Sequence, residues 1–432
     1  MVKFEKEFLL GAATAAHQVE GNNIYSDCWA QENMEFSDYV EPSGKAVDHY
    51  HRFEEDIRLM AEAGLNAYRF SIEWARIEPE QGRFDDNEIA HYRDVLKCCR
   101  AYGIEPIVTM HHFSSPMWLI RQGGWENEET IGYFADYCKY VIEQLGDEIN
   151  FVCTINEANM GLQLSAIIEK YMKIMNATDR TTAADDGKNV ESHVQVGMNL
   201  GMMNQMKRKA EENRRLFGME QPHVFLSDRT KEGDMLVIRA HQAAKAAMKA
   251  VKPSLQVGIT LSLHDVQSVP GGEARASEEW DAEFGHYLPY IIEDDFFGIQ
   301  NYTRSVYGAD GIEPNPRDAR ITQMDYENYP EALEHVIRRV NKELPIPLIV
   351  TENGIATSDD EEREIFILKA LEGVKRCMEE GIPVRGYCYW SLLDNFEWAK
   401  GFSMTFGLIE VDRNTMNRQP KKSLKTLGGC RV

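Results

Sequence analysis

The sequence predicts a protein of the α/β class, folded as a (β/α)8 TIM barrel with elaborated loops on its active face. Three observations lead to this prediction. The chain has 432 residues, of which 43% are hydrophobic, and this is enough apolar mass for one large core. Eight short apolar runs alternate with longer amphipathic stretches. Several runs end in a polar or charged residue, as barrel strands do where they reach the active face.

The eight runs have the length and the β-prone composition of buried strands. In chain order they are Phe8–Thr14, Asn66–Ile72, Pro106–His112, Asn150–Glu157, Gln256–Leu263, Asp295–Thr303, Pro347–Asn353 and Val384–Leu392. Eight such units favour a closed barrel over a doubly wound sheet, which is the alternative for the same alternation.

The stretches between most of these runs are rich in Ala, Glu, Leu, Lys and Arg, which favour helix. They are Tyr50–Ala63, Asn87–Tyr102, Glu128–Leu145, Gly233–Lys252, Pro330–Lys342 and Asp359–Glu380. Several are expected to end at a glycine, namely Gly64, Gly103, Gly146 and Gly381, as is typical of helix C-termini.

The segment at about 167–230 breaks this rhythm, because it is far longer than an ordinary connection between a strand and a helix. We interpret it as an insertion after the fourth strand, and such loops lie on the active face of a barrel. No linker or break in composition divides the chain. Residues 1–432 are therefore expected to form a single catalytic domain.

Charge, hydropathy and cysteine usage exclude several kinds of partner. The 47 Lys and Arg against 70 Asp and Glu leave a net charge of −23, which opposes a nucleic-acid interface. No apolar window is long enough to span a membrane, and acids interrupt the first apolar patch at Glu5 and Glu7, so we expect a cytoplasmic protein without a membrane partner. The eight cysteines show no CxxC spacing, which favours reduced thiols over a zinc site or disulfides.

Two carboxylates stand at strand ends where a barrel carries its chemistry. Glu157 closes the fourth run in Thr-Ile-Asn-Glu, and Glu352 closes the seventh in Thr-Glu-Asn-Gly. A single glutamate at a strand end is most simply a solvated or ion-paired residue. Two at one barrel mouth can flank a glycosidic bond, one as acid/base and the other as nucleophile.

Six motifs of the chain resemble glycoside hydrolase family 1, the β-glucosidase family, over the region from Phe8 to about Lys421. They are FLLGAATAAHQVEG (Phe8–Gly21), YRFSIEWARIEPEQG (Tyr68–Gly82), GIEPIVTMHHF (Gly103–Phe113), TINEAN (Thr154–Asn159), TENG (Thr351–Gly354) and WSLLDNFEWAKGF (Trp390–Phe402). They occur in the family's order and at the expected barrel positions. The resemblance implies a retaining exo-β-glycosidase that needs no cofactor and acts on a small-molecule β-glycoside.

The resemblance also implies a role for each matching residue. Glu352 would be the nucleophile, Arg69 the cation that keeps it ionised, and Glu157 the acid/base. Asn156 would bind the sugar 2-hydroxyl and Tyr302 would orient the nucleophile. The substrate-binding residues would be Gln18, His112 and Glu397 for hydroxyls, with Trp390 beneath the sugar ring and Trp398 as a wall.

Several positions depart from the family's pattern. Ala158 stands where proline is usual, Gln300-Asn301-Tyr302 replaces Asn-Tyr-Tyr, and Tyr326 occupies a position where tryptophan is common on the leaving-group side. The connection from Ser262 to Asp295 is also shorter than usual. We expect these changes to alter the preference for the leaving group before they alter the mechanism.

Three other functions compete with a β-glucosidase that also tolerates β-galactosides or β-fucosides. A 6-phospho-β-glycosidase is disfavoured because the carboxylate of Glu397 would repel a phosphate. An inactive sugar-binding barrel would have lost a catalytic glutamate, and both are present. A metal-dependent hydrolase rests only on His111 and His112, whose side chains point to opposite faces of a strand, so no metal is expected. The sequence leaves the oligomeric state open.

Overall fold

The computed structural model describes residues 2–166, 168 and 206–432, and its centre is a barrel of parallel strands. The strands are β1 (Leu9–Ala13), β2 (Ala67–Ser71), β3 (Glu105–His111), β4 (Phe151–Ile155), β5 (Gln256–Gly258), β6 (Thr260–Ser262), β8 (Phe297–Gln300), β11 (Leu348–Asn353) and β12 (Val384–Trp390). Their order in the sheet is β5-β4-β3-β2-β1-β12-β11-β8-β6. The predicted (β/α)8 barrel is confirmed.

The fifth predicted strand is interrupted, which explains why nine strands build an eight-membered barrel. β5 pairs with β4 and β6 pairs with β8, and only Ile259 separates β5 from β6 along the chain. The segment from Gln256 to Ser262 thus joins the two edges of the sheet. Each of the eight predicted runs contains one barrel strand or this divided one.

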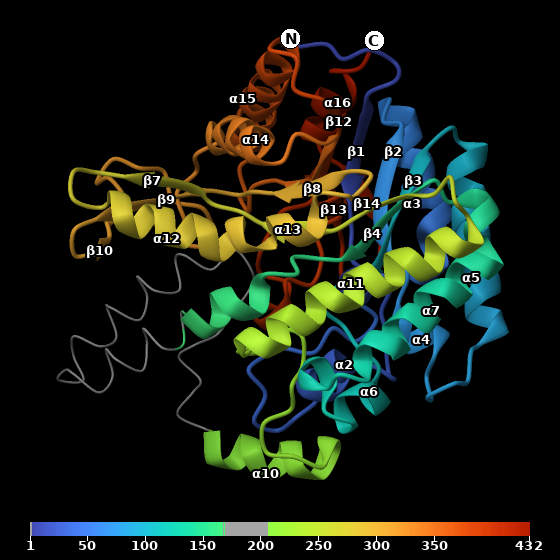
Figure 1. Cartoon of the computed structure of the whole chain (residues 1–432). Helices are drawn as coiled ribbons and strands as arrows, with labels where there is room; N and C mark the ends of the chain where they lie inside the picture. Colours follow the sequence, from blue (N-terminus) through green and yellow to red (C-terminus); the bar gives the residue numbers. More distant parts are fainter. Residues whose placement is uncertain (1, 167, 169–205) are drawn as a thin grey trace.

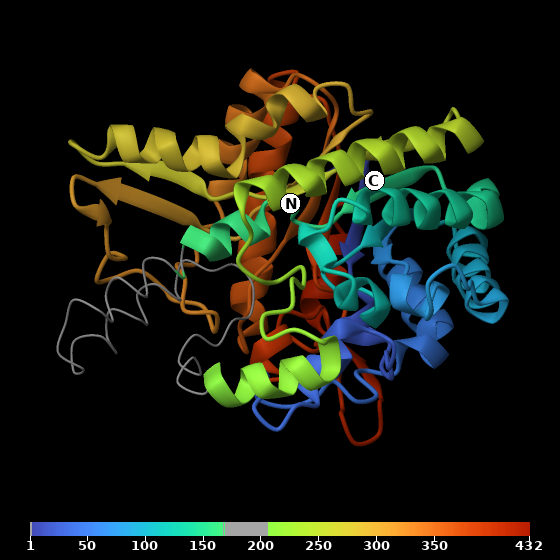
Figure 2. The same cartoon turned by 60° about the horizontal axis from the view of Figure 1, so that its bottom comes forward.

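Long helices surround the barrel (Figure 1). They are α3 (His49–Ala63), α5 (Asp86–Ala101), α7 (Thr130–Leu145), α11 (Lys231–Val251), α14 (Ala332–Glu343) and α15 (Asp360–Glu379). All six agree with the predicted helices to within about two residues. Figure 2 shows α7 and α11 side by side. None of the described helices is both long and apolar enough to cross a membrane.

The structure confirms all four predicted glycine ends. Gly64, Gly103 and Gly381 have φ values of 98°, 69° and 88°, the left-handed backbone that favours glycine. Gly146 directly follows the last residue of α7, but its φ of −60° is right-handed. There the chain continues into a 3-10 turn, η2 (Gly146–Glu148), so a reversal of the backbone is not needed.

Shorter elements build the rest of the described chain. The helical ones are α1 (Ala16–Val19), α2 (Asp27–Glu32), α4 (Trp74–Ile77), α6 (Met117–Arg121), η1 (Gly124–Glu126), α10 (Met206–Phe217), α12 (Glu273–Glu283), η4 (Gly285–Tyr287), α13 (Leu288–Ile291), η5 (Trp398–Lys400) and α16 (Lys422–Gly428). The strands are β7 (Asp265–Ser268), β9 (Arg304–Gly308) and β10 (Gly311–Ile312), which form a second sheet, and the hairpin of β13 (Ile409–Val411) and β14 (Arg418–Pro420).

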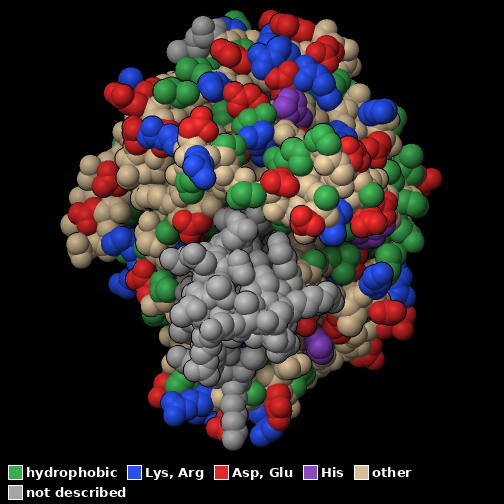
Figure 3. Space-filling view, turned by 90° about the vertical axis from the view of Figure 1, so that its left-hand side faces the viewer, with side chains coloured by type: hydrophobic (Ala, Val, Ile, Leu, Met, Phe, Trp, Pro, Cys, Tyr) green, Lys and Arg blue, Asp and Glu red, His purple; other side chains and the backbone are tan. Residues whose placement is uncertain are grey.

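The second sheet and α12 extend from one side of the barrel (Figure 1). Figure 3 views this side, and acidic and basic side chains are interspersed over the described part of the surface. Most of the insertion expected at about 167–230 falls on residues 167 and 169–205, which lie outside the described residues.

The barrel interior is packed with buried residues and is polar at the carboxyl ends of its strands. The buried inner residues include small side chains such as Ala13, Ala67, Cys153 and Cys388. The two chain ends meet on the side of the amino ends, where the Phe4 N–H donates to the Cys430 carbonyl at 2.8 Å. The polar end of the barrel therefore faces away from the termini, and the predicted site residues gather there.

Candidate active site

The two predicted catalytic glutamates are both buried at the carboxyl ends of barrel strands. Glu352 lies in β11, and Glu157 follows β4 by two residues. The backbone of Glu157 is left-handed, with a φ of 43°, which is unusual for a residue other than glycine. Its N–H donates to Thr260 Oγ1 at 3.0 Å, and the N–H of Ala158 donates to the Thr260 carbonyl at 3.0 Å. β6 therefore holds the turn that presents Glu157.

Glu352 is surrounded by donors from two other strands. Arg69 in β2 forms an ion pair with its Oε1 through Nη1, and the Tyr302 hydroxyl donates to Oε2 at 2.5 Å. Arg69 also donates through Nη2 to Asn156 Oδ1 at 2.5 Å, and Gln300 Nε2 donates to the same oxygen at 2.9 Å. Because its oxygen is used in this way, Asn156 is oriented with Nδ2 unpaired among the described residues.

The surroundings of the two carboxyls separate their protonation. Burial raises the pKa of both. At Glu352 the Arg69 cation and the Tyr302 hydroxyl oppose this rise, whereas at Glu157 the charge of Glu352 adds to it, and the pKa of Glu157 lies well above its usual range. A hydrogen bond with Ser262 only partly offsets that rise. A single proton shared by this pair therefore resides on Glu157, with Glu352 ionised.

Aromatic and amide groups lie on the neighbouring strand ends. The His112 ring is stacked against Trp390 and Trp398, with centroids 5.7 and 6.2 Å apart. Gln18 Nε2 donates to the Phe396 carbonyl at 2.6 Å and approaches Glu397 Oε2 at 3.4 Å. All of these side chains are buried. They place flat apolar surfaces beside hydrogen-bonding groups, the combination that suits a sugar ring.

The structure brings all ten predicted site residues to one end of the barrel. Two polar atoms of the binding group, Gln18 Oε1 and His112 Nδ1, have no hydrogen-bond partner among the described residues. The Tyr326 hydroxyl is also buried without such a partner, and its pKa is raised first by burial and then by the charges of Glu397 and neighbouring groups. These atoms are available to a ligand.

The adjacent histidines have different surroundings, as predicted for neighbours on a strand. His111 Nε2 lies 2.9 Å from Ser115 Oγ, and its ring packs against Trp125 and Phe225 rather than against the tryptophans near His112. Burial and the nearby Arg229 cation lower the pKa of His111 to about 3. Within the described part of the chain, no three His, Cys, Asp or Glu side chains gather as a metal site would require.

Two residues of the fifth strand segment were not predicted. Thr260 holds the turn after β4, and Ser262 is hydrogen-bonded to Glu157. The sequence signal was the polar end of the run Thr-Leu-Ser-Leu-His, the same type of signal that pointed to Glu157 and Glu352.

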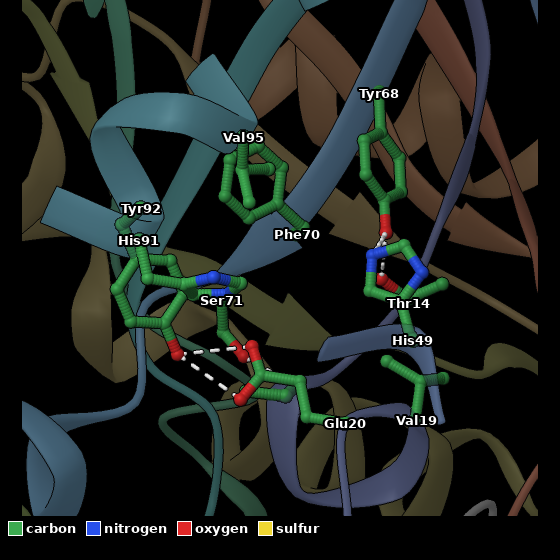
Figure 4. A pocket seen from close by; sticks show the side chains of 11 residues that line it. Thr14, Val19, Glu20, His49, Tyr68, Phe70, Ser71, His91, Tyr92 and Val95 are labelled. Carbon is green, nitrogen blue, oxygen red and sulfur yellow. Dashed lines mark hydrogen bonds between the residues drawn. The ribbon is translucent and has the colours of Figure 1, made fainter. Parts of the chain in front are cut away.

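A separate small cavity lies on the outer side of β1 and β2 (Figure 4). Its lining includes Glu20, which accepts from the Tyr92 hydroxyl at 2.9 Å, and Tyr68, whose hydroxyl lies 2.6 Å from Thr14 Oγ1. The cavity has a volume of about 10 Å³, which is room for about one water molecule. None of the ten site residues lines it, and it is too small to be the sugar site.

Comparisons with known proteins agree with this geometry. The model of glycosyl hydrolase family 1 matches residues 1–196 and 282–428. A crystal structure of the β-glycosidase BGL167 is 44% identical, with a TM-score of 0.86 over 99% of this chain and 96% of that one. β-Glucosidase A of Thermotoga maritima is 28% identical and the 6-phospho-β-galactosidase of Clostridium acetobutylicum 27%, each over 98% of this chain and 96% of the relative. The protein is therefore a glycoside hydrolase and belongs to glycosyl hydrolase family 1.

Proposed function

We propose that the protein is a retaining exo-β-glycosidase that removes terminal β-D-glucosyl residues from neutral glycosides. The observation that carries this proposal is the asymmetric pair of buried carboxyls. Glu352 is held by Arg69 and Tyr302, while Glu157 has its pKa raised well above its usual range. This is the division of roles that a nucleophile and an acid/base require.

In the first half-reaction, a carboxylate oxygen of Glu352 attacks the anomeric carbon while the bond to the glycosidic oxygen breaks. Glu157 gives its proton to that oxygen, so the leaving group departs as a neutral alcohol and the sugar becomes an ester of Glu352. Nδ2 of Asn156 is free to donate to the sugar 2-hydroxyl, a contact that strengthens as positive charge develops on the ring.

The second half-reaction reuses Glu157 as a base. Once Glu352 is esterified, its negative charge is gone and the pKa of Glu157 falls. Glu157 then accepts a proton from water as the water attacks the anomeric carbon and the ester bond to Glu352 breaks. Glu352 is restored as a carboxylate, and the released sugar keeps the β configuration. Both displacements occur at the same carbon, so retention follows from two inversions.

The binding residues support a neutral sugar. Trp390 and Trp398 offer apolar faces to the ring, while Gln18, His112 and Glu397 offer partners for its hydroxyls. The buried carboxylate of Glu397 favours hydroxyls over a phosphate, although one relative at 27% identity is named a 6-phospho-β-galactosidase. We also expect β-galactosides and β-fucosides to be accepted, because hydroxyl contacts alone discriminate weakly between epimers.

A trapping experiment tests the mechanism. The protein is incubated with 2,4-dinitrophenyl 2-deoxy-2-fluoro-β-D-glucoside, and its peptides are examined by mass spectrometry. We expect one sugar on the peptide that contains Glu352, and none on Glu352→Gln. The Glu157→Ala variant should still be labelled, because this leaving group needs little acid assistance. Turnover of ordinary substrates without an adduct at Glu352 would contradict the proposal.

A substrate panel tests the sugar and the alternatives. 4-Nitrophenyl β-D-glucoside, β-D-galactoside and β-D-fucoside are compared with the 6-phosphates of the first two. Hydrolysis of the phosphates alone would favour the 6-phospho-β-glycosidase, and binding of glucose without turnover would favour an inactive barrel. Activity that a chelator removes would favour a metal hydrolase. The single catalytic domain, the insertion and the cytoplasmic location stay predictions of the sequence.

A further inference from the structure

A buried arginine contacts the turn that carries Glu157. Arg229 Nη1 donates to the carbonyl of Ala158 at 3.0 Å, and Nη2 donates to the carbonyl of Phe225 at 3.0 Å. The Arg229 residue is 5% exposed. We propose that Arg229 is a positioning residue that fixes the acid/base Glu157, an inference that rests on the role proposed for Glu157 above.

The turn needs such a restraint. Glu157 has a φ of 43°, and a residue other than glycine persists in this strained region only where its surroundings fix it. Thr260 binds the N–H groups of Glu157 and Ala158, and the Met160 N–H donates to the carbonyl of Glu157 at 2.9 Å. The next carbonyl along the turn is that of Ala158, which accepts from Arg229. At position 158 this chain has alanine where the resemblance to the family implies proline, and alanine restricts the backbone less than proline does. The hydrogen bond from Arg229 supplies a restraint from outside the turn.

Arg229 is itself held on several sides. Its N–H donates to Ser165 Oγ at 2.8 Å, and the same hydroxyl donates to the Arg229 carbonyl at 2.9 Å. The guanidinium lies over the Phe225 ring at 4.5 Å. Gly161 passes so close that a Cβ there would lie 2.6 Å from Arg229 Cζ. A side chain packed in this way has little freedom, and it transmits its position to the turn.

Arg229 lies within residues 197–281, the stretch that the family model leaves unmatched. Its guanidinium nevertheless lies close enough to β3 and β4 to contact Ala158 and to lower the pKa of His111, after the effect of burial. The unmatched stretch thus contacts the residue that follows the acid/base Glu157.

Leaving-group dependence separates positioning from general loss of structure. Dinitrophenolate leaves without a proton, whereas phenolate needs one, so only phenyl β-glucoside depends strongly on a well-placed acid. We expect Arg229→Met to lower kcat/KM for phenyl β-glucoside by about tenfold more than for 2,4-dinitrophenyl β-glucoside. Arg229→Lys, which keeps a donor and the charge, should recover part of this difference. The basic limb of the pH profile of kcat/KM, which follows the protonation of Glu157, should also shift in Arg229→Met.

Matched variants make the result decisive. Arg239→Met removes an exposed arginine from α11 and should leave the ratio of the two substrates unchanged. Ser165→Ala keeps the guanidinium but removes its backbone anchor, so it should reproduce the Arg229→Met pattern more weakly, and it decides the matter with Arg229→Lys if Arg229→Met does not fold. Equal losses on both substrates in these variants would overturn the positioning role. If Glu157→Ala itself shows no dependence on the leaving group, the acid/base assignment fails first.

Discussion

Two of the buried arginine–carboxylate pairs in the described part of the chain behave differently. Arg69 and Glu352 lie at the barrel mouth, while Arg418 in β14 and Asp56 in α3 lie between the outer helices and the β13–β14 hairpin. Arg418 binds Asp56 through two parallel hydrogen bonds of 2.7 and 2.8 Å, and His49 adds a third at 2.7 Å. Although burial opposes it, these bonds lower the pKa of Asp56, whereas the pKa of Glu352 is raised by burial.

The two pairs differ in how completely hydrogen bonds satisfy the polar atoms around each pair. Around Asp56 the hydrogen bonds continue from His49 Nε2 to the Tyr68 hydroxyl at 3.0 Å and on to Thr14. Around Glu352, polar atoms of Asn156, Gln18 and Tyr326 lack partners among the described residues. A buried charge alone therefore does not mark a site. At the barrel mouth, unpaired polar atoms of the predicted binding residues accompany the buried charge, and a ligand can supply the missing bonds.

The largest expected effect comes from breaking the pair at the mouth. Glu352→Gln should lower kcat by about 10⁴-fold or more, because no covalent intermediate can form. Its stability should fall less than that of Asp56→Asn, since burial disfavours the ionised form of Glu352, whereas the partners of Asp56 favour its ionised form. Steady-state kinetics and thermal unfolding on the same samples check both statements. If Glu352→Gln retained a tenth of wild-type activity, Glu352 would not be the nucleophile, and the Arg69–Glu352 pair would not differ from the other pair in function.

Breaking the satisfied pair should affect stability alone. Asp56→Asn leaves Arg418 as an unpaired buried charge, which should cost about 3–5 kcal/mol of unfolding free energy. Because the folded pKa of Asp56 is lowered, its contribution is complete above the unfolded value of about pH 4 and is lost as pH falls through the folded pKa. Urea unfolding at several pH values should show the wild type and Asp56→Asn converging in acid. Equal gaps at all pH values would contradict this linkage.

Sequence reasoning reached the barrel because its strands and helices are long and strongly patterned. It missed β7, β9 and β10, since strands of two to five residues outside the barrel give little periodicity. It also missed the interruption at Ile259, where the run from Gln256 to Leu263 reads as one strand. The end of α7 at Gly146 was predicted, but not the 3-10 turn that follows it.

The candidate site divides in a similar way. The strand-end rule pointed to Glu157 and Glu352 from their position alone, while the remaining eight residues came from the resemblance to the family. Arg229 had no signal in the sequence. Its hydrogen bond goes to a backbone carbonyl 71 residues away. Every residue has such a carbonyl whatever its type, so the residue sequence does not reveal the contact. Contacts of this kind become visible only when the fold brings the two segments together.

A smaller effect should follow from removing only the charge of Glu352. In the 2-fluoroglucosyl enzyme Glu352 is an ester, so the pKa of Glu157 should fall relative to the free enzyme, where that charge raises it. The pH dependence of reactivation by an added alcohol reports Glu157 in the intermediate, and kcat/KM reports it in the free enzyme. The limb that follows Glu157 should lie at lower pH for reactivation. The same pKa in both states would show that Glu352 does not control Glu157.

The smallest effects should follow from removing single tyrosine hydroxyls. One of these hydroxyls is unpaired at the candidate site, and the other is hydrogen-bonded near Asp56. Tyr326→Phe removes a hydroxyl without a described partner, so its unfolding free energy should stay within about 0.5 kcal/mol of the wild type. Its kcat/KM should fall by roughly two- to tenfold for leaving groups that carry hydroxyls, and less for phenyl β-glucoside. Tyr68→Phe should show the reverse, losing about 1–2 kcal/mol because its hydroxyl bonds both Thr14 and His49, with activity unchanged. If Tyr326→Phe were the more destabilising of the two variants, the Tyr326 hydroxyl would stabilise the fold rather than bind a ligand.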